Sequence, residues 1–245
     1  MTQGLRGRSI LLIGLCLAFT AIFSVLGAWQ IQRRAWKLDL IAQVEQRIHA
    51  TPVPAPGPAL WAGLSKEADA YRRVRLSGAY DHDREVLTQA VTDLGPGFWV
   101  MTPLRTEQGF TVLVNRGFVP TALKTPAARA AGQRPGSVTV VGLLRLSEPG
   151  GGFLRTNRPS EGRWYSRDVQ AIGQAERIAT LAPYFVDADA TSNPGGWPRG
   201  GLTVVRFPNS HLIYALTWFG LAVLTSGAAA YVVIDARRTQ RKEDE

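Results

Sequence analysis

The stretch FPNSHLIYALTWFGLAVLTSGAAAYVVI, at residues 207–234, decides how the rest of the sequence is interpreted. It carries no formally charged residue. A helix rises about 1.5 Å per residue and the hydrocarbon layer is about 30 Å thick, so about 20 apolar residues are enough to cross it. The stretch therefore predicts a membrane-spanning helix. A histidine, His211, lies close to the expected start of this helix.

A second apolar run, SILLIGLCLAFTAIFSVLGAWQI at residues 9–31, meets the same criterion of length and apolarity. The alternative is a cleaved signal peptide. The run is longer than the roughly 7–15 residues of a signal-peptide core, and residues 27–29 (GAW) make a poor cleavage site. We therefore expect a retained transmembrane helix here too.

Two spans place both termini on the same side of the membrane. Arginines and lysines near the span ends are almost equally frequent on the two sides, so the positive-inside rule decides little. We expect a cytoplasmic N-terminus at residues 1–8, a cytoplasmic tail at residues 235–245, and an extracytoplasmic segment between the spans.

The segment that follows the first span changes character twice. Residues 32–50 carry apolar side chains at helical spacing and predict a juxtamembrane amphipathic helix. The prolines of TPVPAPGPAL then end the helix, because each proline lacks a backbone donor and clashes with the preceding turn. Residues 51–70 are thus expected to form a linker. The apolar positions of the amphipathic helix are Trp36, Leu40, Ile41, Val44 and Ile48.

From Tyr71 the apolar period becomes two, which indicates β-strands. Glycine, proline and aspartate separate the strands, so most connections are turns and the sheet is expected to be antiparallel or a barrel. One short helix is expected at residues 166–178. The predicted fold is an α+β membrane protein, with two transmembrane helices that flank a β-rich extracytoplasmic domain at residues 71–206. The expected strands lie at residues 71–80, 84–91, 97–106, 110–119, 137–146, 183–189 and 202–207.

Composition excludes several classes of function. The net charge is +9, but the basic residues are scattered and form no nucleic-acid-binding module, so no nucleic-acid partner is expected. The single cysteine, Cys16, falls inside the first span, so the β-rich domain has neither a disulfide nor a thiolate for a metal. Known catalytic motifs such as G-x-S-x-G and H-E-x-x-H are missing, and we do not expect an enzyme.

His211 is the first candidate for a functional residue. It lies on one helical stripe with mostly small residues, against which another helix could pack. Its imidazole either binds a metal or haem at the membrane interface, or simply hydrogen-bonds a carbonyl there. The stripe comprises His211, Ala215, Trp218, Ala222, Thr225 and Ala229, and the opposing face is expected from Gly14, Ala18, Ala21 and Ala28.

Two further features each allow a functional and a structural interpretation, and two others are interpreted as structural. The glycines of NPGGWPRGG at residues 193–201 permit close approach, so Trp197 either caps a planar ligand or lies in a loop at the membrane. Arg116 either pairs with a propionate or phosphate, or joins a structural ion pair. His82, between two aspartates, is expected to be solvated. Trp164, Tyr165 and Asp168 are expected to be core and turn residues.

Five stretches together resemble the Surfeit locus protein one (Shy) family. Each is modest alone, but they occur in the order and at roughly the spacings typical of that family, between about Leu26 and Ala222. The segment at residues 123–136 carries no family mark. The stretches are LGAWQIQRRAWKLDLI, SGAYDHDREVL, VLVNRGFVP, NPGGWPRGG and NSHLIYALTWFGLA.

The resemblance implies an assembly factor for the haem-copper respiratory oxidase, cytochrome c oxidase. It implies a bacterial member in the inner (cell) membrane with a periplasmic domain. The implied partners are the oxidase catalytic subunit, a haem a synthase and membrane lipids. Haem a is the implied transient cargo, and His211, in the N-x-H-L-x-Y segment, is the implied ligand of its iron. Direct copper binding is not expected, because clustered histidine, methionine or cysteine is lacking.

In this hypothesis the other site residues follow from their positions. Trp197, Tyr214 and Trp218 line the apolar part of the haem site, and Arg206 pairs with a propionate near the membrane edge. Two other hypotheses remain: a cofactor-free membrane scaffold that stabilises an oxidase assembly intermediate, and an enzyme at the membrane face. Haem binding by the purified protein distinguishes the scaffold from the haem carrier.

Overall fold

The computed structural model describes residues 2–152, 154–205 and 207–243. It divides into two compact units. One unit contains the two chain ends, residues 1–42 and 206–245, and the other contains residues 43–205.

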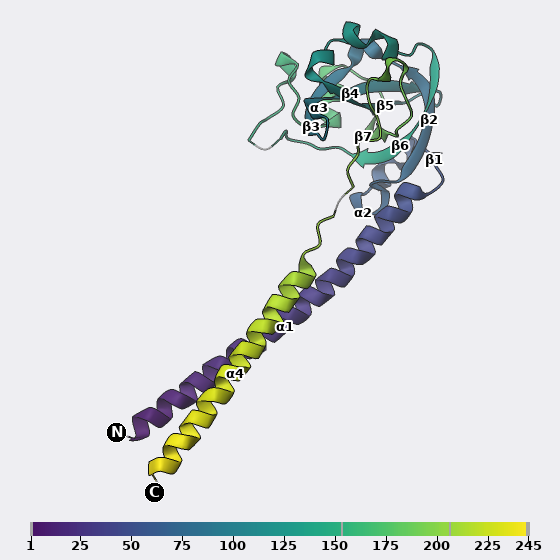
Figure 1. Ribbon diagram of the computed structural model, residues 1–245. Coiled ribbons are helices and arrows are strands. Elements are labelled where there is room, and N and C mark those ends of the chain that lie inside the picture. The colour runs from purple at the N-terminus through teal and green to yellow at the C-terminus, as the bar shows by residue number, and fades with distance from the viewer. Residues whose placement is uncertain (1, 153, 206, 244–245) are drawn as a thin grey trace. The chain divides into compact units, whose positions relative to one another are not determined.

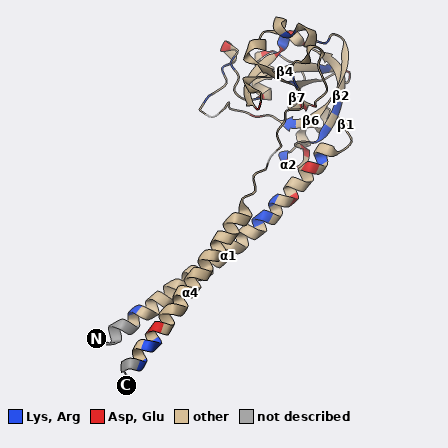
Figure 2. Cartoon of the chain, viewed as in Figure 1, with Lys and Arg blue, Asp and Glu red and all other residues tan. Residues whose placement is uncertain are grey.

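The two predicted membrane spans are confirmed as long helices (Figure 1). Helix α1 covers Thr2–His49 without interruption, so the expected amphipathic segment continues the first span directly. Helix α4 covers His211–Glu243. Both are long and apolar enough to cross a membrane, and each has a long stretch without Lys, Arg, Asp or Glu (Figure 2). The most apolar 18-residue windows within Gly7–His49 and His211–Arg241 have mean hydropathies of 2.6 and 1.6.

Within the helical unit, α1 and α4 pair in antiparallel fashion. Thr20 Oγ1 lies 2.8 Å from Thr225 Oγ1, and Gln30 Oε1 lies 2.8 Å from His211 Nδ1. Residue numbers therefore rise along α1 as they fall along α4. Interhelical hydrogen bonds of this kind favour association in hydrocarbon, where no water competes for the polar groups.

The interface of α4 is the predicted stripe, with Ala215, Ala222 and Ala229 all buried. The opposing face predicted on α1 is wrong, because Gly14, Ala18, Ala21 and Ala28 are exposed. The residues that α1 turns toward α4 instead follow alternating three- and four-residue steps. They are Cys16, Thr20, Phe23, Gly27 and Gln30.

The observed face of α1 makes contacts with α4 that a face of small side chains could not make. Phe23 stacks on Trp218 with ring centroids 5.6 Å apart. Gly27 is small enough to lie beneath the ring of Phe219, since a Cβ there would come within 2.7 Å of a ring carbon. Aromatic packing and hydrogen bonding thus outweigh the preference for small residues in the choice of face.

The helical unit exposes its large apolar side chains. Leu11 is 73% exposed and Val223 is 71% exposed. Apolar surface of this extent on a helix pair is unfavourable in water and matches a hydrocarbon environment.

The other unit is built on a closed β-sheet (Figure 1). The strand order is β1-β2-β6-β7-β5-β4-β3, and β2 also pairs with β4. This additional pairing closes β2, β6, β7, β5 and β4 into a barrel and leaves β1 and β3 outside the ring. The strand bounds are Val53–Pro54 (β1), Arg73–Tyr80 (β2), Val86–Thr92 (β3), Gly95–Thr106 (β4), Thr111–Pro120 (β5), Ser137–Leu146 (β6) and Leu181–Ala188 (β7).

The expected antiparallel barrel is correct except at two pairs. The β1–β2 and β5–β7 pairs are parallel. Strand β2 pairs with β6 along most of its length and with β4 from Gly78 to Tyr80. At the junction Gly78 is required, because a Cβ there would collide with the carbonyl of Arg105.

The barrel has an inner core and a second core on one outer face. Alternate residues such as Val74, Val112 and Tyr184 fill the interior. Helix α3, Val169–Ala175, covers the outer face with Ile172 against Phe185. Strand β5 contributes to both cores, and its residues are buried on both sides from Thr111 to Val119.

Two segments differ from their predicted structure. The expected linker at residues 51–70 is part of the β unit: it forms β1, a 3₁₀ helix at Pro58–Gly63 and helix α2 at Lys66–Asp69. Trp61 in this segment packs against the inner core, so the prolines shape a fixed segment. The strand expected at residues 202–207 is wrong, since residues 202–205 are not in a strand.

The helix pairing can be tested by engineered disulfides. With Cys16 replaced by alanine, we expect Thr20→Cys and Thr225→Cys to crosslink readily in membranes, because the native Oγ atoms lie 2.8 Å apart. Ala18→Cys with Thr225→Cys is the matched control and should not crosslink, because Ala18 is exposed. Crosslinking of the control pair alone would show that α1 presents the alanine face instead. Gel mobility with and without reductant measures both.

Candidate functional site

His211 is the first residue of α4, as predicted. The backbone N–H of Tyr214 donates to the carbonyl of Ser210 at 3.3 Å, which places Ser210 at the N-cap. Pro208 precedes the helix and disfavours its extension backwards, because the proline ring clashes with a helical conformation of the residue before it. The helix start thus holds His211 at one end of the helix interface.

The imidazole of His211 is hydrogen-bonded through one ring nitrogen. Nδ1 donates to Oε1 of Gln30 on α1, at 2.8 Å. In a neutral imidazole with its hydrogen on Nδ1, Nε2 keeps a lone pair. Nε2 has no hydrogen-bond partner among the described residues. His211 is half-buried, so this nitrogen is a potential ligand for a metal ion.

Gln30 was missed as a site residue at the level of sequence. Its position carries a signal, since Thr20, Phe23, Gly27 and Gln30 follow the three- and four-residue steps of a helix interface. A polar side chain at the end of such a series needs a partner on the facing helix. That partner could not be identified before the pairing of α1 and α4 was known.

The other predicted site residues are dispersed. Trp218 lies on the same face as His211 and stacks on Phe23. Tyr214 follows His211 by three residues, on the same side of α4, and is 55% exposed. Trp197 belongs to the β unit. Arg206 lies outside the described residues.

The loop that contains Trp197 is attached to the barrel. Arg199 and Phe118 exchange two backbone hydrogen bonds of 2.9 Å each. Gly117 permits this contact, because it has a φ of 129° and a Cβ there would collide with the backbone of Arg199. Trp197 is half-buried and its carbonyl lies against Gly132. The glycines of this loop therefore have a structural use in the β unit.

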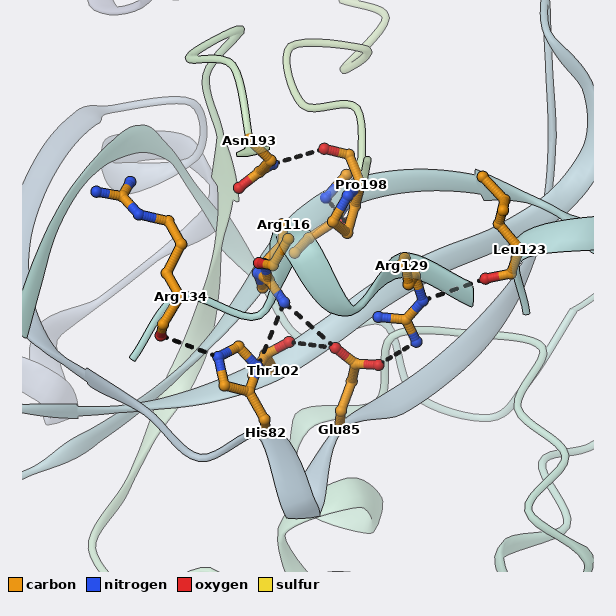
Figure 3. Close-up of polar contacts among 12 residues, drawn as sticks. His82, Glu85, Thr102, Arg116, Leu123, Arg129, Arg134, Asn193 and Pro198 are labelled. Atoms are coloured by element: carbon orange, nitrogen blue, oxygen red, sulfur yellow. Dashed lines mark hydrogen bonds and ion pairs between the residues drawn. The ribbon is translucent and has the colours of Figure 1, made fainter. Parts of the chain in front are cut away.

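A buried charged cluster, shown in Figure 3, lies beside the same loop. We call it the Glu85 cluster; it comprises Glu85, Thr102, Arg116, Arg129 and His82. The Glu85 carboxylate accepts from Arg129, from Arg116 at 3.4 Å and from Thr102 at 3.1 Å. The side chains of Glu85 and both arginines are at most 3% exposed.

The Glu85 cluster attaches the segment at residues 121–136 to the barrel. Arg116 on β5 donates to the carbonyl of Gly132, and Arg129 donates to the carbonyl of Leu123 at 3.2 Å. Arg116 thus takes part in a structural ion pair, as one of its two interpretations predicted. These buried arginines therefore fix residues 123–136, the segment that carries none of the family's sequence motifs.

His82 is not simply solvated, which corrects that prediction. It is half-buried, and its Nε2 contacts the carbonyl oxygen of Arg134 at 3.1 Å. Its Nδ1 lies 3.4 Å from Arg116. The 3₁₀ turn His82–Arg84 therefore directs this histidine into the Glu85 cluster.

Burial controls two pKa values in and beside the cluster. The guanidinium of Arg116 lies over the ring of Tyr80, 4.9 Å from its centroid. Burial lowers the pKa of Arg116, against the opposing effects of Tyr80 and Glu85. Burial raises the pKa of Tyr80 to about 12, although Arg116 and Arg134 act in the other direction.

A second polar cluster supports the outer wall of the barrel. Asp187 on β7 accepts hydrogen bonds from Asn115, Arg145, Arg167 and Thr203. The neighbouring residues 162–168 include the core and turn residues that were predicted there. Trp164 is in the outer core and the Asp168 carboxylate caps α3 by accepting from Ala171 N–H at 3.1 Å.

Metal-binding side chains do not cluster in the described part of the chain, where no group of three or more His, Cys, Asp or Glu residues could hold an ion. Any metal bound here would need ligands from elsewhere besides His211. Fold and geometry together define a class: two helices able to cross a membrane precede and follow a closed β-barrel in the chain, and one imidazole nitrogen at the helix interface has no hydrogen-bond partner among the described residues.

Comparison with known proteins identifies the family within this class. The SURF1 family model matches residues 17–223. The chain is 38% identical to Surfeit locus protein 1 of Homo sapiens over 218 residues, which is 82% of this chain and 70% of that protein. It is 39% identical to the Mus musculus protein (82% and 69%) and 37% identical to the Takifugu rubripes protein (82% and 88%). The chain belongs to the SURF1 family, a family of cytochrome c oxidase assembly factors.

Loss of Glu85 should destabilise the β unit strongly. Glu85→Ala leaves Arg116 and Arg129 buried without their carboxylate, which typically costs about 3–5 kcal/mol. Glu107→Ala is the control, because Glu107 is exposed, and should change the unfolding free energy by no more than about 0.5 kcal/mol. Denaturant unfolding of the detergent-solubilised chain measures both. Equal stability of the two variants would contradict a stabilising role for the Glu85 cluster.

The raised pKa of Tyr80 predicts a loss of stability at high pH. Between an unfolded pKa of about 10 and the folded value of about 12, the unfolded chain releases the phenol proton while the folded chain retains it. The folded state therefore loses stability as pH rises from about 10, by at most about 2.7 kcal/mol from this group. Tyr80→Phe should reduce that slope in denaturant titrations. An unchanged slope would show that Tyr80 has an ordinary pKa.

Proposed function

We propose that this chain is a membrane assembly factor for cytochrome c oxidase, that haem a is its transient cargo, and that His211 binds the haem iron. Family membership supports the assembly role. The observation that carries the haem proposal is the arrangement of His211, whose Nδ1 is held by Gln30. Haem iron accepts a neutral imidazole nitrogen as an axial ligand.

Gln30 prepares His211 for this role. Metal-binding histidines commonly donate their second ring N–H to an oxygen, which fixes the tautomer and the ring orientation. Here Gln30 Oε1 is that oxygen, so the hydrogen stays on Nδ1 and Nε2 is the coordinating nitrogen. Gln30 is thus a positioning residue that does not itself touch the iron.

The surroundings of His211 suit a cargo that must be released. The stacked rings of Phe23 and Trp218 lie two turns along from His211 on the same face and supply apolar surface. A single protein ligand leaves the iron free to take its other ligand from a receiving protein. Trp197 and Tyr214 are proposed to contact the apolar part of the haem, and Arg206 is proposed to pair with a propionate.

Topology follows from the same proposal. Helices α1 and α4 cross a bacterial inner membrane, the N-terminus and the tail are cytoplasmic, and the β unit lies in the periplasm. The oxidase catalytic subunit receives the haem and a haem a synthase supplies it. Lipids contact the exposed apolar side chains of both helices.

A cofactor-free scaffold is the second candidate function. It is favoured by the packing that His211 already has within the helix interface, where its hydrogen bond to Gln30 joins α1 to α4. In this role the barrel holds an oxidase assembly intermediate, and His211 serves helix pairing alone.

Optical spectra of the detergent-purified chain, from cells that make haem a, distinguish these functions. The wild type should carry haem a and His211→Ala should lose it. Gln30→Ala should bind haem roughly 10–100-fold more weakly, the usual effect of removing such an orienting partner. Gln32→Ala is the matched control, because Gln32 is an exposed glutamine on the same helix, and should equal the wild type.

Two outcomes would contradict the haem proposal. Wild-type protein without haem a would favour the scaffold. Equal haem content in the wild type and His211→Ala would remove His211 from the site. The Thr20→Cys and Thr225→Cys crosslink, formed in the His211→Ala background, confirms that the helices of the variant remain paired.

A further inference from the structure

A large cleft opens on the β unit between the 3₁₀ helix Pro58–Gly63 and α3. Its volume is about 810 Å³, within the range of roughly 300–1,000 Å³ typical of small-molecule sites. All of its lining residues belong to the unit of residues 43–205. The cleft therefore shares no residue with the proposed His211 site.

The floor of the cleft is apolar because side chains at the edges of the inner and outer cores remain partly exposed there. Trp61, Leu64 and Leu146 pack against the inner core and remain partly exposed. Ile178 and Leu181 do the same against the outer core. All of these side chains line the cleft, so it presents a continuous apolar surface to a ligand.

One wall of the cleft is polar and comes from α3 and the turn after it. Gln170 and Gln174 lie four residues apart on α3 and therefore share one helix face. Arg177 lies in the turn after the helix, where its φ is 52°, and also lines the cleft. Arg177 is exposed, and its guanidinium has no hydrogen bond or ion pair in the described part of the chain. It is thus a free cation beside an apolar floor.

The residue types at the cleft restrict what can bind. The lining contains no histidine, cysteine or methionine, so it offers no axial ligand to a haem iron. The carboxylate of Asp168, which also lines the cleft, already accepts hydrogen bonds from Ala171 N–H and Gly150 N–H. These bonds hold the Asp168 carboxylate at the start of α3, whereas Arg177 is the cation of the lining that a ligand can pair with.

We propose that this cleft binds an amphipathic small molecule that has an aliphatic body and one anionic group. The aliphatic part lies on the floor formed by Trp61, Leu146 and Leu181. The anionic group pairs with Arg177, and the amides of Gln170 and Gln174 are available as further hydrogen-bond donors. A fatty-acid carboxylate has this chemistry.

Photocrosslinking in phosphatidylcholine nanodiscs tests the proposal on the full chain. The probes are a palmitic-acid analogue with a diazirine and the alcohol of the same chain. Labelling is mapped by mass spectrometry, and labelling of α1 and α4 serves as the internal reference for partition into the membrane. We expect the acid to label residues 166–183 in a saturable manner and the alcohol to label them less.

Two variants with matched controls give the decisive comparison. Gln174→Trp fills the cleft from its wall and should abolish labelling at residues 166–183, whereas Ala175→Trp, at an exposed position that does not line the cleft, should not. Arg177→Gln should lower labelling by the acid about tenfold, as expected for one charge-assisted hydrogen bond. Arg177→Lys should retain most of it.

Several results would overturn the proposal. Labelling spread evenly over the β unit, or equal effects of the two tryptophan variants, would show that the cleft is not a binding site. Equal labelling by the acid and the alcohol, unchanged in Arg177→Gln, would exclude recognition of an anion.

Discussion

The double pairing of β2, with β6 along its length and with β4 at its end, is the constraint on which the β unit depends. It turns an open sheet into a barrel, so alternate residues of every ring strand must point into one interior. It also leaves β5 between the interior and the layer of α3, with no face toward water. A strand buried on both sides can carry Asn115 and Arg116 only if each finds a partner, and Asp187 and Glu85 supply them.

The helical unit obeys a different constraint, because hydrocarbon gives no driving force for apolar helices to associate. Its interface therefore depends on the contacts that lipid cannot replace. Thr20 with Thr225 and Gln30 with His211 supply polar ones, and Phe23 with Trp218 supplies ring packing. The same hydrogen bond that joins the helices also sets the tautomer of His211. Helix pairing and the proposed ligand role of His211 are for this reason coupled through Gln30.

Much of the architecture could be predicted from the sequence, because spans, strands and the short helix each have a local period. The seven apolar or alternating stretches before residue 190 correspond to α1 and to β2–β7, and the predicted stripe on α4 was also correct.

The failures concern residues whose partners are distant in the chain. The face of α1 was predicted from residue size, whereas Phe23 and Thr20 choose it through contacts with α4. Residues 202–205 have the composition of a strand, but the barrel is already closed without them. The buried roles of Glu85 and Arg129, which lie 44 residues apart, likewise depend on tertiary contacts.

The route by which the chain leaves the barrel toward α4 has a mechanical consequence. A force that a moving membrane helix exerts along the backbone would reach the β unit first at the hydrogen bond from Thr203 to Asp187. It would then reach the bond from Gly201 N–H to the Ala188 carbonyl, and next the two bonds between Arg199 and Phe118. These anchors lie on β7 and β5, the parallel pair of the ring. Tension on this segment would thus be borne by two largely buried strands and not by an edge strand such as β3 or β1.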